Sequence, residues 1–359
     1  MYPTKEQEMF FAQTFGCCRF IYNKMLEDRI EHYKLTSEML KNYPSQYKET
    51  YPFLKDVDAF ALVGAYNALK SAYKNFFEKR ANFPKFKSKK YSKQSYTTYN
   101  SHPNKPVIKI ENNHIRLPKI GFVKIKYHRP IQPEYKIKNT TITKNPSGKY
   151  YVSVCVEYEY EYPTPILNKD NSIGLDYSSP DFYVDNQGKK PNYPKYFRRA
   201  EERLAREQRK LNKMIQGSHN YKKQRIKVAR CHEKVANQRK DWLHKLSYCF
   251  IKNYDYVFVE DIDLRAMAGA LKLGKSTNDN GFGMFREMLS YKMKDRGKIF
   301  HKIDKWYPSS KTCHYCGYIK EDLTLNDREW ICPNCGELIY RDWNSAINIL
   351  NQGFKELKI

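Results

Sequence analysis

Apolar residues recur every three or four positions in the first part of the chain, and this spacing predicts helices up to about residue 80. The stretches FFAQTFGCCRFIYNKMLEDRIEHYKL (10–35) and DAFALVGAYNALKSAYKNFFEKR (58–80) both follow it. The aromatic residues of the second stretch share its apolar stripe, so we interpret them as core residues rather than as a platform for bases. They are Phe60, Tyr66, Tyr73, Phe76 and Phe77.

From about residue 105 to residue 162, apolar and polar residues alternate instead. HIRLPKIGFVKIKYH (114–128) and GKYYVSVCVEYEYEY (148–162) are rich in β-branched and aromatic residues, and NPSG (145–148) is a turn signal. These features predict the strands of a small β-barrel. The preceding segment, FPKFKSKKYSKQSYTTY (83–99), alternates lysine with aromatic residues. This composition is typical of a strand or loop that lies on the phosphate backbone of a nucleic acid, although a solvated linker has the same composition.

A third block begins after NKDNS (168–172). IGLDYSSPDFYVDNQG (173–188) predicts two strands with turns, and residues 193–215 and 221–251 predict two long helices in a hairpin. One face of the second helix is apolar and the opposite face is basic. We expect both cysteines on the apolar face to be core residues. That face comprises Val228, Cys231, Val235, Trp242, Leu246 and Cys249. A strand over 255–264 and a helix over 283–300 follow.

The charge of the chain indicates what kind of partner it binds. The chain of 359 residues contains 65 Lys and Arg against 39 Asp and Glu, which gives a formal net charge of +26. Aromatic residues make up 15%, including 31 tyrosines. Positive charge attracts polyanions, and interleaved aromatic rings can stack on bases. The composition therefore favours a nucleic-acid partner, while a merely basic soluble protein remains the alternative.

The start of the chain, MYPTKEQEMF, has no apolar core of a signal peptide, and the longest apolar stretch, 60–69, is too short to span a bilayer. We therefore expect no membrane partner and a cytoplasmic protein, associated with the nucleoid of a prokaryote. In a reducing compartment the nine cysteines are expected to be metal ligands or buried thiols rather than disulfides.

Four cysteines have the spacing of a metal site. Cys313 and Cys316 form one C-x2-C pair, Cys332 and Cys335 form another, and fifteen residues separate the pairs. Four thiolates satisfy a tetrahedral Zn²⁺ without an open position, so the site is predicted to be structural. The glycines that follow each pair fit tight turns around the sulfur atoms. His314 lies inside the first pair but is not needed as a ligand.

Three acidic residues are surrounded by apolar ones. Asp176 interrupts a predicted strand, Glu260 ends another, and Asp342 comes just before a predicted helix that it could cap. Two strand ends and a helix N-terminus can bring three carboxylates together, where they would repel one another unless Mg²⁺ ions neutralised them. This pattern predicts a two-metal nuclease centre of the RNase H-like type. Four other acidic residues are interpreted as turn or supporting residues, namely Asp181, Asp185, Asp261 and Asp263.

GALKLGKS (269–276) satisfies the literal pattern of a phosphate-binding P-loop. A P-loop needs a strand before it and a helix that opens at its lysine. Here a helix-like segment precedes the motif and a Gly- and Asn-rich segment follows it, so we predict a loop near the nuclease site and no ATP binding.

Several of these motifs occur in the order found in a known family. GLDYSSPDFYVD, VFVEDIDLRAMA, WYPSSKTCHYCG, REWICPNCG and RDWNSAINI resemble TnpB, as do the N-terminal YPTKEQ, FGCCRFIYNKML and FPKFKSKK. TnpB proteins are RNA-guided nucleases of insertion sequences, long called OrfB transposases, and are related to type V CRISPR effectors. Members of the family usually begin with YRIYPT, so the first barrel strand is expected to be missing here or the start to be displaced.

The resemblance implies an α+β multidomain architecture. A β-barrel wedge domain contains a helical recognition insert, and an α/β RNase H-like (RuvC) nuclease domain contains an inserted zinc ribbon. The expected boundaries are 1–7 and 83–166 for the wedge domain, 8–82 for the recognition domain, 167–308 and 339–359 for the nuclease domain, and 309–338 for the target-nucleic-acid-binding zinc ribbon.

The resemblance also implies an activity. The expected function is cleavage of double-stranded DNA beside a short flanking motif, by a monomer that carries one guide RNA from the transposon end. Asp176, Glu260 and Asp342 are the implied catalytic Mg²⁺ ligands, and Arg328 matches a family arginine near the site that could position phosphate. The alternatives are a nuclease-inactive, RNA-guided DNA-binding repressor and a protein with a direct or accessory role in DNA transposition.

Overall fold

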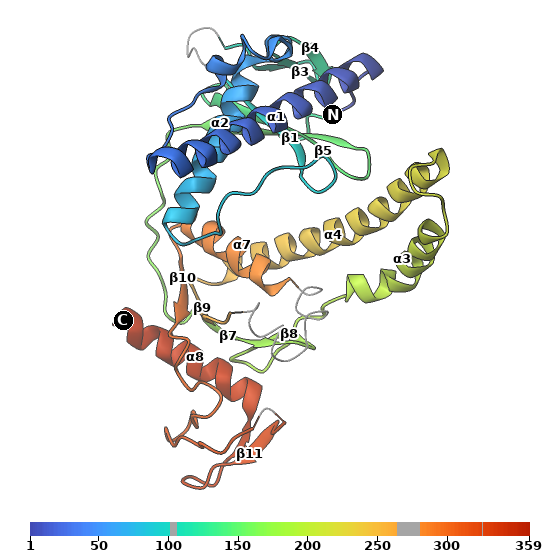
Figure 1. Ribbon diagram of the computed structural model, residues 1–359. Helices are drawn as coiled ribbons and strands as arrows, with labels where there is room; N and C mark the ends of the chain where they lie inside the picture. The colour runs from blue at the N-terminus through green and yellow to red at the C-terminus, as the bar shows by residue number, and fades with distance from the viewer. Residues whose placement is uncertain (101–105, 264–280, 325) are drawn as a thin grey trace. The chain divides into compact units, whose positions relative to one another are not determined.

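The computed structural model describes residues 1–100, 106–263, 281–324 and 326–359. The chain forms two compact units, Met1–Tyr160 and Glu161–Ile359, and each combines helices with β-sheet (Figure 1). None of the helices in the described ranges combines the length and the apolar character that a bilayer crossing requires.

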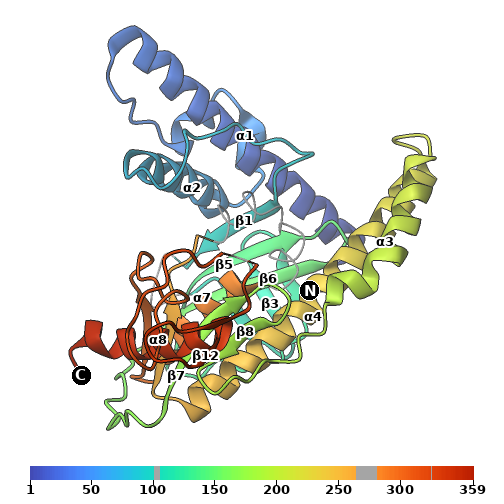
Figure 2. The ribbon, with the colours of Figure 1, turned by 90° about the horizontal axis from the view of Figure 1, so that it is seen from below.

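Two long helices and two short 3-10 helices begin the first unit. They are α1 (Lys5–Thr36), η1 (Pro44–Tyr47), η2 (Pro52–Lys55) and α2 (Ala59–Phe77). Thr4 starts α1 with a capping box, because its side chain accepts from the Gln7 N–H while the Gln7 side chain accepts from the Thr4 N–H. Asp58 caps α2 by accepting from the Phe60 N–H. Figure 2 shows α1 and α2 lying side by side.

Six strands form two antiparallel three-stranded sheets in this unit, in the orders β1-β5-β6 and β2-β3-β4. The NPSG turn joins β5 to β6 as predicted, with Gly148 at a φ of +86°. Tyr2 forms an isolated bridge with Lys124 at the end of β4. Helices and sheets share one hydrophobic core, in which Phe11 and Phe15 of α1 lie against Tyr96 of β1. The strands are β1 (Gln94–Tyr99), β2 (Lys109–Glu111), β3 (His114–Leu117), β4 (Gly121–Lys124), β5 (Lys136–Lys144) and β6 (Tyr150–Glu157).

The second unit is built on a mixed sheet in the order β10-β9-β7-β8. β7, β9 and β10 run parallel, and β8 pairs antiparallel with β7. The strands are β7 (Ser172–Ser178), β8 (Phe182–Asp185), β9 (Tyr256–Glu260) and β10 (Ile299–Ile303). The helices are α3 (Tyr196–Asn212), α4 (His219–Asn253), α7 (Phe282–Lys294) and α8 (Arg341–Leu357), and a hairpin of β11 (Glu329–Ile331) and β12 (Leu338–Tyr340) precedes α8.

Side chains alternate between the two faces of this sheet, so each strand contributes to two cores. Ile173, Leu175, Val257 and Val259 face the core that contains α4 and α7. Phe258 and its neighbours belong to a second core, which contains Ile349 of α8. The register pairs Leu175 with Val259, so the next residues, Asp176 and Glu260, are neighbours on the face that α8 covers.

Two glycines allow α8 to approach this face closely. A Cβ at Gly174 of β7 would lie 2.3 Å from the Ala346 carbonyl oxygen, and a Cβ at Gly353 of α8 would lie 2.0 Å from the Phe258 ring. These distances are far below van der Waals contact. The absence of a side chain at both positions therefore sets the distance between the helix and the strands.

The core predictions for Cys249 and Phe77 were wrong. Cys249 is exposed, because the buried stripe of α4 runs through Leu243, Ser247 and Phe250, one position later than the sequence pattern suggested. Cys231 is only half-buried. Phe77 is 62% exposed, because it is the last residue of α2. The other four aromatic residues of that stripe are buried or half-buried.

We predict that Gly174→Ala lowers the free energy of unfolding of the second unit by about 2 kcal/mol or more, because the added methyl group must displace backbone atoms of α8. All four tryptophans (Trp242, Trp306, Trp330 and Trp343) lie in this unit, so their fluorescence during urea unfolding isolates its stability. Gly16→Ala on α1 is the control for specificity, since it lies in the first unit, its Cβ meets nothing within 4 Å, and it should leave the tryptophan transition unchanged. An unchanged urea midpoint for Gly174→Ala would contradict the close packing.

Candidate active site

Three acidic side chains from three elements line one cleft of about 890 Å³ in the second unit. Asp176 lies in β7, Glu260 is the last residue of β9, and Asp342 lies in the first turn of α8. The structure thus places all three predicted carboxylates around the same space. Asp342 does not cap α8 as expected, because the helix already begins at Arg341.

Mutual repulsion and burial make this cleft electrostatically unfavourable for bare carboxylates. Burial, and then the negative charges of Asp342 and Glu260, raise the pKa of Asp176 well above its ordinary value. The Ser345 hydroxyl and Arg341 oppose that increase. Burial also raises the pKa of Glu260. A bound cation would stabilise the ionised forms, so the donor set fits a hard divalent metal ion.

Two arginines accompany Asp342. Arg341 Nε and Nη2 each donate to Asp342 Oδ1 over 3.2 Å, and the Arg341 side chain is 13% exposed. Arg328 Nη1 lies 3.6 Å from Asp342 Oδ2, and its side chain is 62% exposed. Arg328 therefore reaches the cleft from the segment before β11 while remaining open to a ligand.

A third arginine holds the chain just after β9. Arg286 of α7 donates from Nη1 to the Glu260 carbonyl over 3.2 Å and from Nη2 to the Ile262 carbonyl over 3.0 Å. This residue was not predicted, because nothing in the helical pattern of α7 shows that one arginine is half-buried against a strand end. Its bonds fix the backbone that carries Glu260.

The four remaining acidic residues have different settings. Asp181 forms an ion pair of 2.9 Å with Lys190, and Asp185 accepts from the N–H groups of Gln187 and Lys189 in a turn. Asp261 and Asp263 also line the cleft, and Asp261 forms ion pairs with Lys302 and Arg286. The P-loop-like segment at 269–276 lies outside the described residues.

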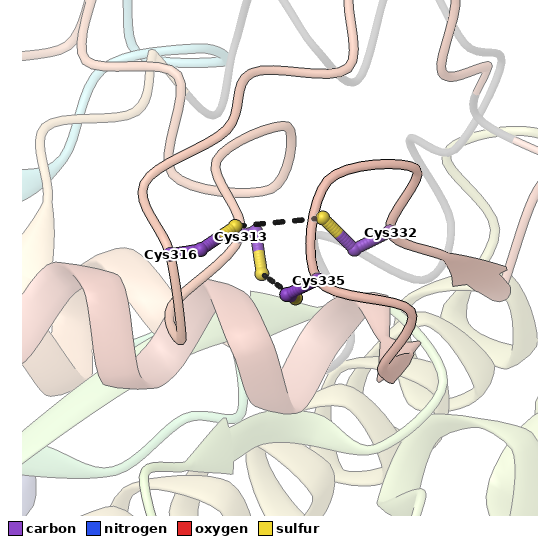
Figure 3. A group of neighbouring side chains, drawn as sticks. All are labelled: Cys313, Cys316, Cys332 and Cys335. Carbon is purple, nitrogen blue, oxygen red and sulfur yellow. Dashed lines mark hydrogen bonds between the residues drawn. The ribbon is translucent and has the colours of Figure 1, made fainter.

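The four predicted zinc ligands meet in one cluster (Figure 3). Their sulfur atoms all lie within 4.8 Å of one another, with Cys313 and Cys335 3.7 Å apart and Cys316 and Cys332 3.6 Å apart. Among the described residues, this is the one group of three or more potential metal ligands whose ligand atoms all lie within 4.8 Å of one another. The carboxylate oxygens of Asp176, Glu260 and Asp342 do not meet this limit. The cluster could hold a tetrahedral metal ion.

The two cysteine loops have the same backbone geometry. The N–H of Gly317 donates to the Cys313 carbonyl, and the N–H of Gly336 donates to the Cys332 carbonyl, both over 2.8 Å. Both glycines have positive φ angles, +78° and +75°, as the tight turns require. Hydrogen bonds from Asn334 and the Tyr318 N–H lower the pKa of Cys316 to about 6, which favours the thiolate that a metal needs.

A buried polar face of α8 fastens the cysteine loops to the helix. Asn344 Oδ1 lies 2.9 Å from both the backbone nitrogen and Nδ1 of His314, so His314 contacts α8 rather than the sulfur cluster. The amide groups of Asn344 and Asn348 donate to the Thr312 carbonyl. These residues were not predicted, although the polar positions in NSAIN on an otherwise apolar helix are a usable signal.

Ser345 connects this face to Asp176. Its hydroxyl donates to Asp176 Oδ1 over 3.1 Å and lies 3.0 Å from the hydroxyl of Ser309, four residues before the first cysteine. Ser345 and Ser309 are both buried. The orientation of Asp176 therefore depends on the segment that leads into the cysteine cluster.

The fold and the cleft define an α+β protein with a carboxylate-lined site and a four-cysteine ribbon, and comparisons with known proteins give its family. The family described as "Probable transposase" (OrfB of the IS605 group) matches residues 153–271, and "Cas12f1-like, TNB domain" matches residues 282–349. A "Helix-turn-helix domain" family matches residues 1–38, where the structure has one continuous helix from Lys5 to Thr36.

Similar proteins extend these matches over nearly the whole chain. A Streptomyces pristinaespiralis protein named "Putative RNA-guided DNA endonuclease" is 34% identical over 98% of this chain and 87% of its own length. The Escherichia coli (strain K12) protein "Putative RNA-guided DNA endonuclease InsQ" is 29% identical over 98% and 90%. The chain belongs to the OrfB/TnpB family, as its motifs predicted.

A solved structure supports the fold. "Cryo-EM structure of the Cas12f1-sgRNA-target DNA complex" matches 97% of this chain and 83% of that chain, with a TM-score of 0.61 and 14% identity. The chain thus has a Cas12f-like α+β fold with mixed sheets.

We predict one zinc ion per chain, bound by the four thiolates. Cys313→Ala should reduce the zinc content, measured by atomic emission on purified protein, from about one equivalent to near zero, because three thiolates leave the tetrahedral site open. Cys231→Ala and Cys249→Ala are the matched controls on α4 and should retain the metal. Full zinc in Cys313→Ala would contradict the assignment.

We also predict that Asp176→Asn stabilises the second unit at pH 7 in magnesium-free buffer. A carboxyl group with a raised folded-state pKa binds its proton more tightly in the folded state. Wild type therefore loses stability as pH rises from about 4, the ordinary carboxyl pKa, through the raised value. The variant lacks the Asp176 contribution to this loss, while the contribution of Glu260 is present in both proteins, so the two should converge near pH 4 by tryptophan-monitored urea unfolding. A variant less stable than wild type at pH 7 would refute this.

Proposed function

We propose that this chain is a transposon-encoded, RNA-guided DNA endonuclease that hydrolyses target DNA beside a short flanking motif. The observation that carries the proposal is the common cleft of Asp176, Glu260 and Asp342 in a member of the OrfB/TnpB family. Relatives that align along nearly the whole chain bear names with the same activity. Base pairing with a guide RNA would select the target, and the basic surface would hold both nucleic acids.

Asp176, Glu260 and Asp342 would hold Mg²⁺, which supplies charge neutralisation of the scissile phosphate and a more acidic bound water. The chain's own residues prepare this site. Ser345 orients the carboxylate of Asp176, and the half-buried Arg286 fixes the backbone at Glu260. Arg341 keeps Asp342 in place, while the exposed Arg328 is positioned to contact a phosphate of the DNA.

The proposal includes the domain assignment. The mixed sheet of β7–β10 with α8 would be the RNase H-like (RuvC) nuclease domain, and the four-cysteine segment would be a zinc ribbon that contacts the target. The two sheets of the first unit would form the wedge barrel, with α1 and α2 as the recognition helices. The active species would be a monomer with one guide RNA, acting at the nucleoid in the cytoplasm.

A nuclease-inactive, RNA-guided DNA-binding repressor is the main alternative. Such a protein has no need for three carboxylates at one site, and the burial of Asp176 beside the negative charges of Asp342 and Glu260 is unfavourable without a cation. The cleft therefore favours the nuclease. A direct or accessory role in DNA transposition finds no comparable support in the described residues.

We predict that the purified ribonucleoprotein cleaves a plasmid carrying the guide-matched target next to randomised flanks. The chain would be co-expressed with the DNA that overlaps and follows its gene, and the bound RNA would be sequenced. Asp176→Ala should reduce cleavage by about a thousandfold or more, because the metal ligand set is incomplete. Asp241→Asn removes an exposed carboxylate of α4 that lines no part of this cleft and should cleave like wild type.

Three results would separate the hypotheses. Cleavage that Asp176→Ala abolishes supports the nuclease. RNA-dependent binding of the target without cleavage supports the repressor. No co-purifying RNA would overturn RNA guidance and leave an unguided nuclease as the function to test.

A further inference from the structure

The helical hairpin of α3 and α4 contains a second concave surface, separate from the carboxylate cleft. Figure 2 shows α3 running alongside the N-terminal part of α4. Residues of the two helices line a groove of about 750 Å³. Six basic residues line it, three from each helix: Arg199, Arg203 and Lys210 of α3, and Lys227, Arg230 and Lys234 of α4.

The spacing of these residues makes two basic rows. Residues three or four apart in a helix share a face and lie about 5–6 Å apart. Arg199 and Arg203 are four residues apart, and Lys227, Arg230 and Lys234 follow at three and four. The row on α3 extends over about 16 Å from Arg199 to Lys210, at 1.5 Å per residue.

Most of this charge is not neutralised by the protein. Within the described part of the chain, five of the six cations form no ion pair, and Lys210 alone has a partner, Glu207, at 3.6 Å. Glu207 is itself 16% exposed and accepts from Gln224 Nε2 over 2.7 Å. Like charges concentrated along one groove repel one another, so a polyanion that follows the rows would relieve the repulsion.

The lining of the groove indicates how that polyanion is bound. Ala200, Cys231 and Val235 are small residues between the basic rows, and the half-buried Tyr196 is the one aromatic residue in the lining. Surfaces that bind single strands combine charge with several exposed rings for base stacking. A groove with charge and almost no rings instead suits the phosphate backbone of a double helix, read without regard to sequence.

We infer that the α3–α4 groove binds the phosphodiester backbone of a double-helical segment of the guide RNA. This rests on the proposed function, in which the guide is the nucleic acid that the protein carries permanently, while target DNA is bound and released. The groove shares no lining residue with the carboxylate cleft, and most of its cations have no ion-pair partner among the residues that the structure describes, which suits a ligand that is held and not hydrolysed. The groove would anchor RNA and take no part in hydrolysis.

The test compares two double variants of the full chain, stripped of nucleic acid by high salt. Arg203→Ala with Arg230→Ala removes one arginine from each row. Arg209→Ala with Arg225→Ala removes one exposed arginine from each of the same helices outside the groove, so the charge change is the same. The probe is a fluorescent RNA duplex of about 16 base pairs. Tryptophan-monitored unfolding confirms that both variants are folded.

Loss of two phosphate contacts should lower the slope of log affinity against log salt by about two, and weaken binding at 0.15 M salt by about thirtyfold. The control pair should change binding by less than about threefold. If both double variants bound the RNA duplex equally weakly, the inference would be overturned, because binding would then depend on the overall charge and not on the groove. An effect confined to a DNA duplex of the same sequence, or to single-stranded RNA, would overturn the assignment to double-helical guide RNA.

Guided cleavage separates this inference from the proposed function. If the groove holds the guide, Arg203→Ala with Arg230→Ala should need more RNA to reach half-maximal cleavage and should regain the wild-type rate at saturating RNA. If the double variant cleaved normally at every RNA concentration, the groove would not be the binding site of the guide RNA. The proposed endonuclease function would be unaffected.

Discussion

Close packing of α8 on the mixed sheet is the constraint on which the second unit depends. Gly174 and Gly353 remove the side chains that would hold the helix away from β7 and β9. Because strand residues alternate between faces, the same approach that buries Ile349 and Phe258 also brings Asp342 to the end of the sheet where Asp176 and Glu260 lie. The hydrophobic core and the acidic cleft are therefore consequences of one interface.

The cysteine ribbon is part of this interface rather than an appendage. β12 ends at Tyr340 and α8 begins at the next residue, so the ribbon leads directly into the helix that carries Asp342. Buried amides of Asn344 and Asn348 hold the segment before the first cysteine, and the Ser309–Ser345 contact extends from that segment to Asp176. A metal that orders the ribbon would also order two of the three carboxylates.

Sequence reasoning located the carboxylates and the cysteines because their signals are local. A C-x2-C pair and an acidic residue at the end of an apolar strand can be read within ten residues. The two glycines, the clamp by Arg286 and the polar face of α8 could not be read this way, because their roles depend on what another element places opposite them. Cys249 shows the same limit: a shift of one residue along α4 decides whether a side chain is buried. Closure of the first unit into a barrel likewise remains a prediction, since its six described strands pair as two separate sheets.

Three carboxylates from distant parts of the chain are proposed to form one metal-binding centre. Titration of the zinc-loaded protein with Mn²⁺, followed by electron paramagnetic resonance, tests it directly. If the centre is one unit, Asp176→Ala, Glu260→Ala and Asp342→Ala should each abolish the same high-affinity Mn²⁺ binding, and the triple variant should lose no more than any single one. Independent, additive losses, or unchanged Mn²⁺ binding in any one of the three variants, would contradict a shared centre.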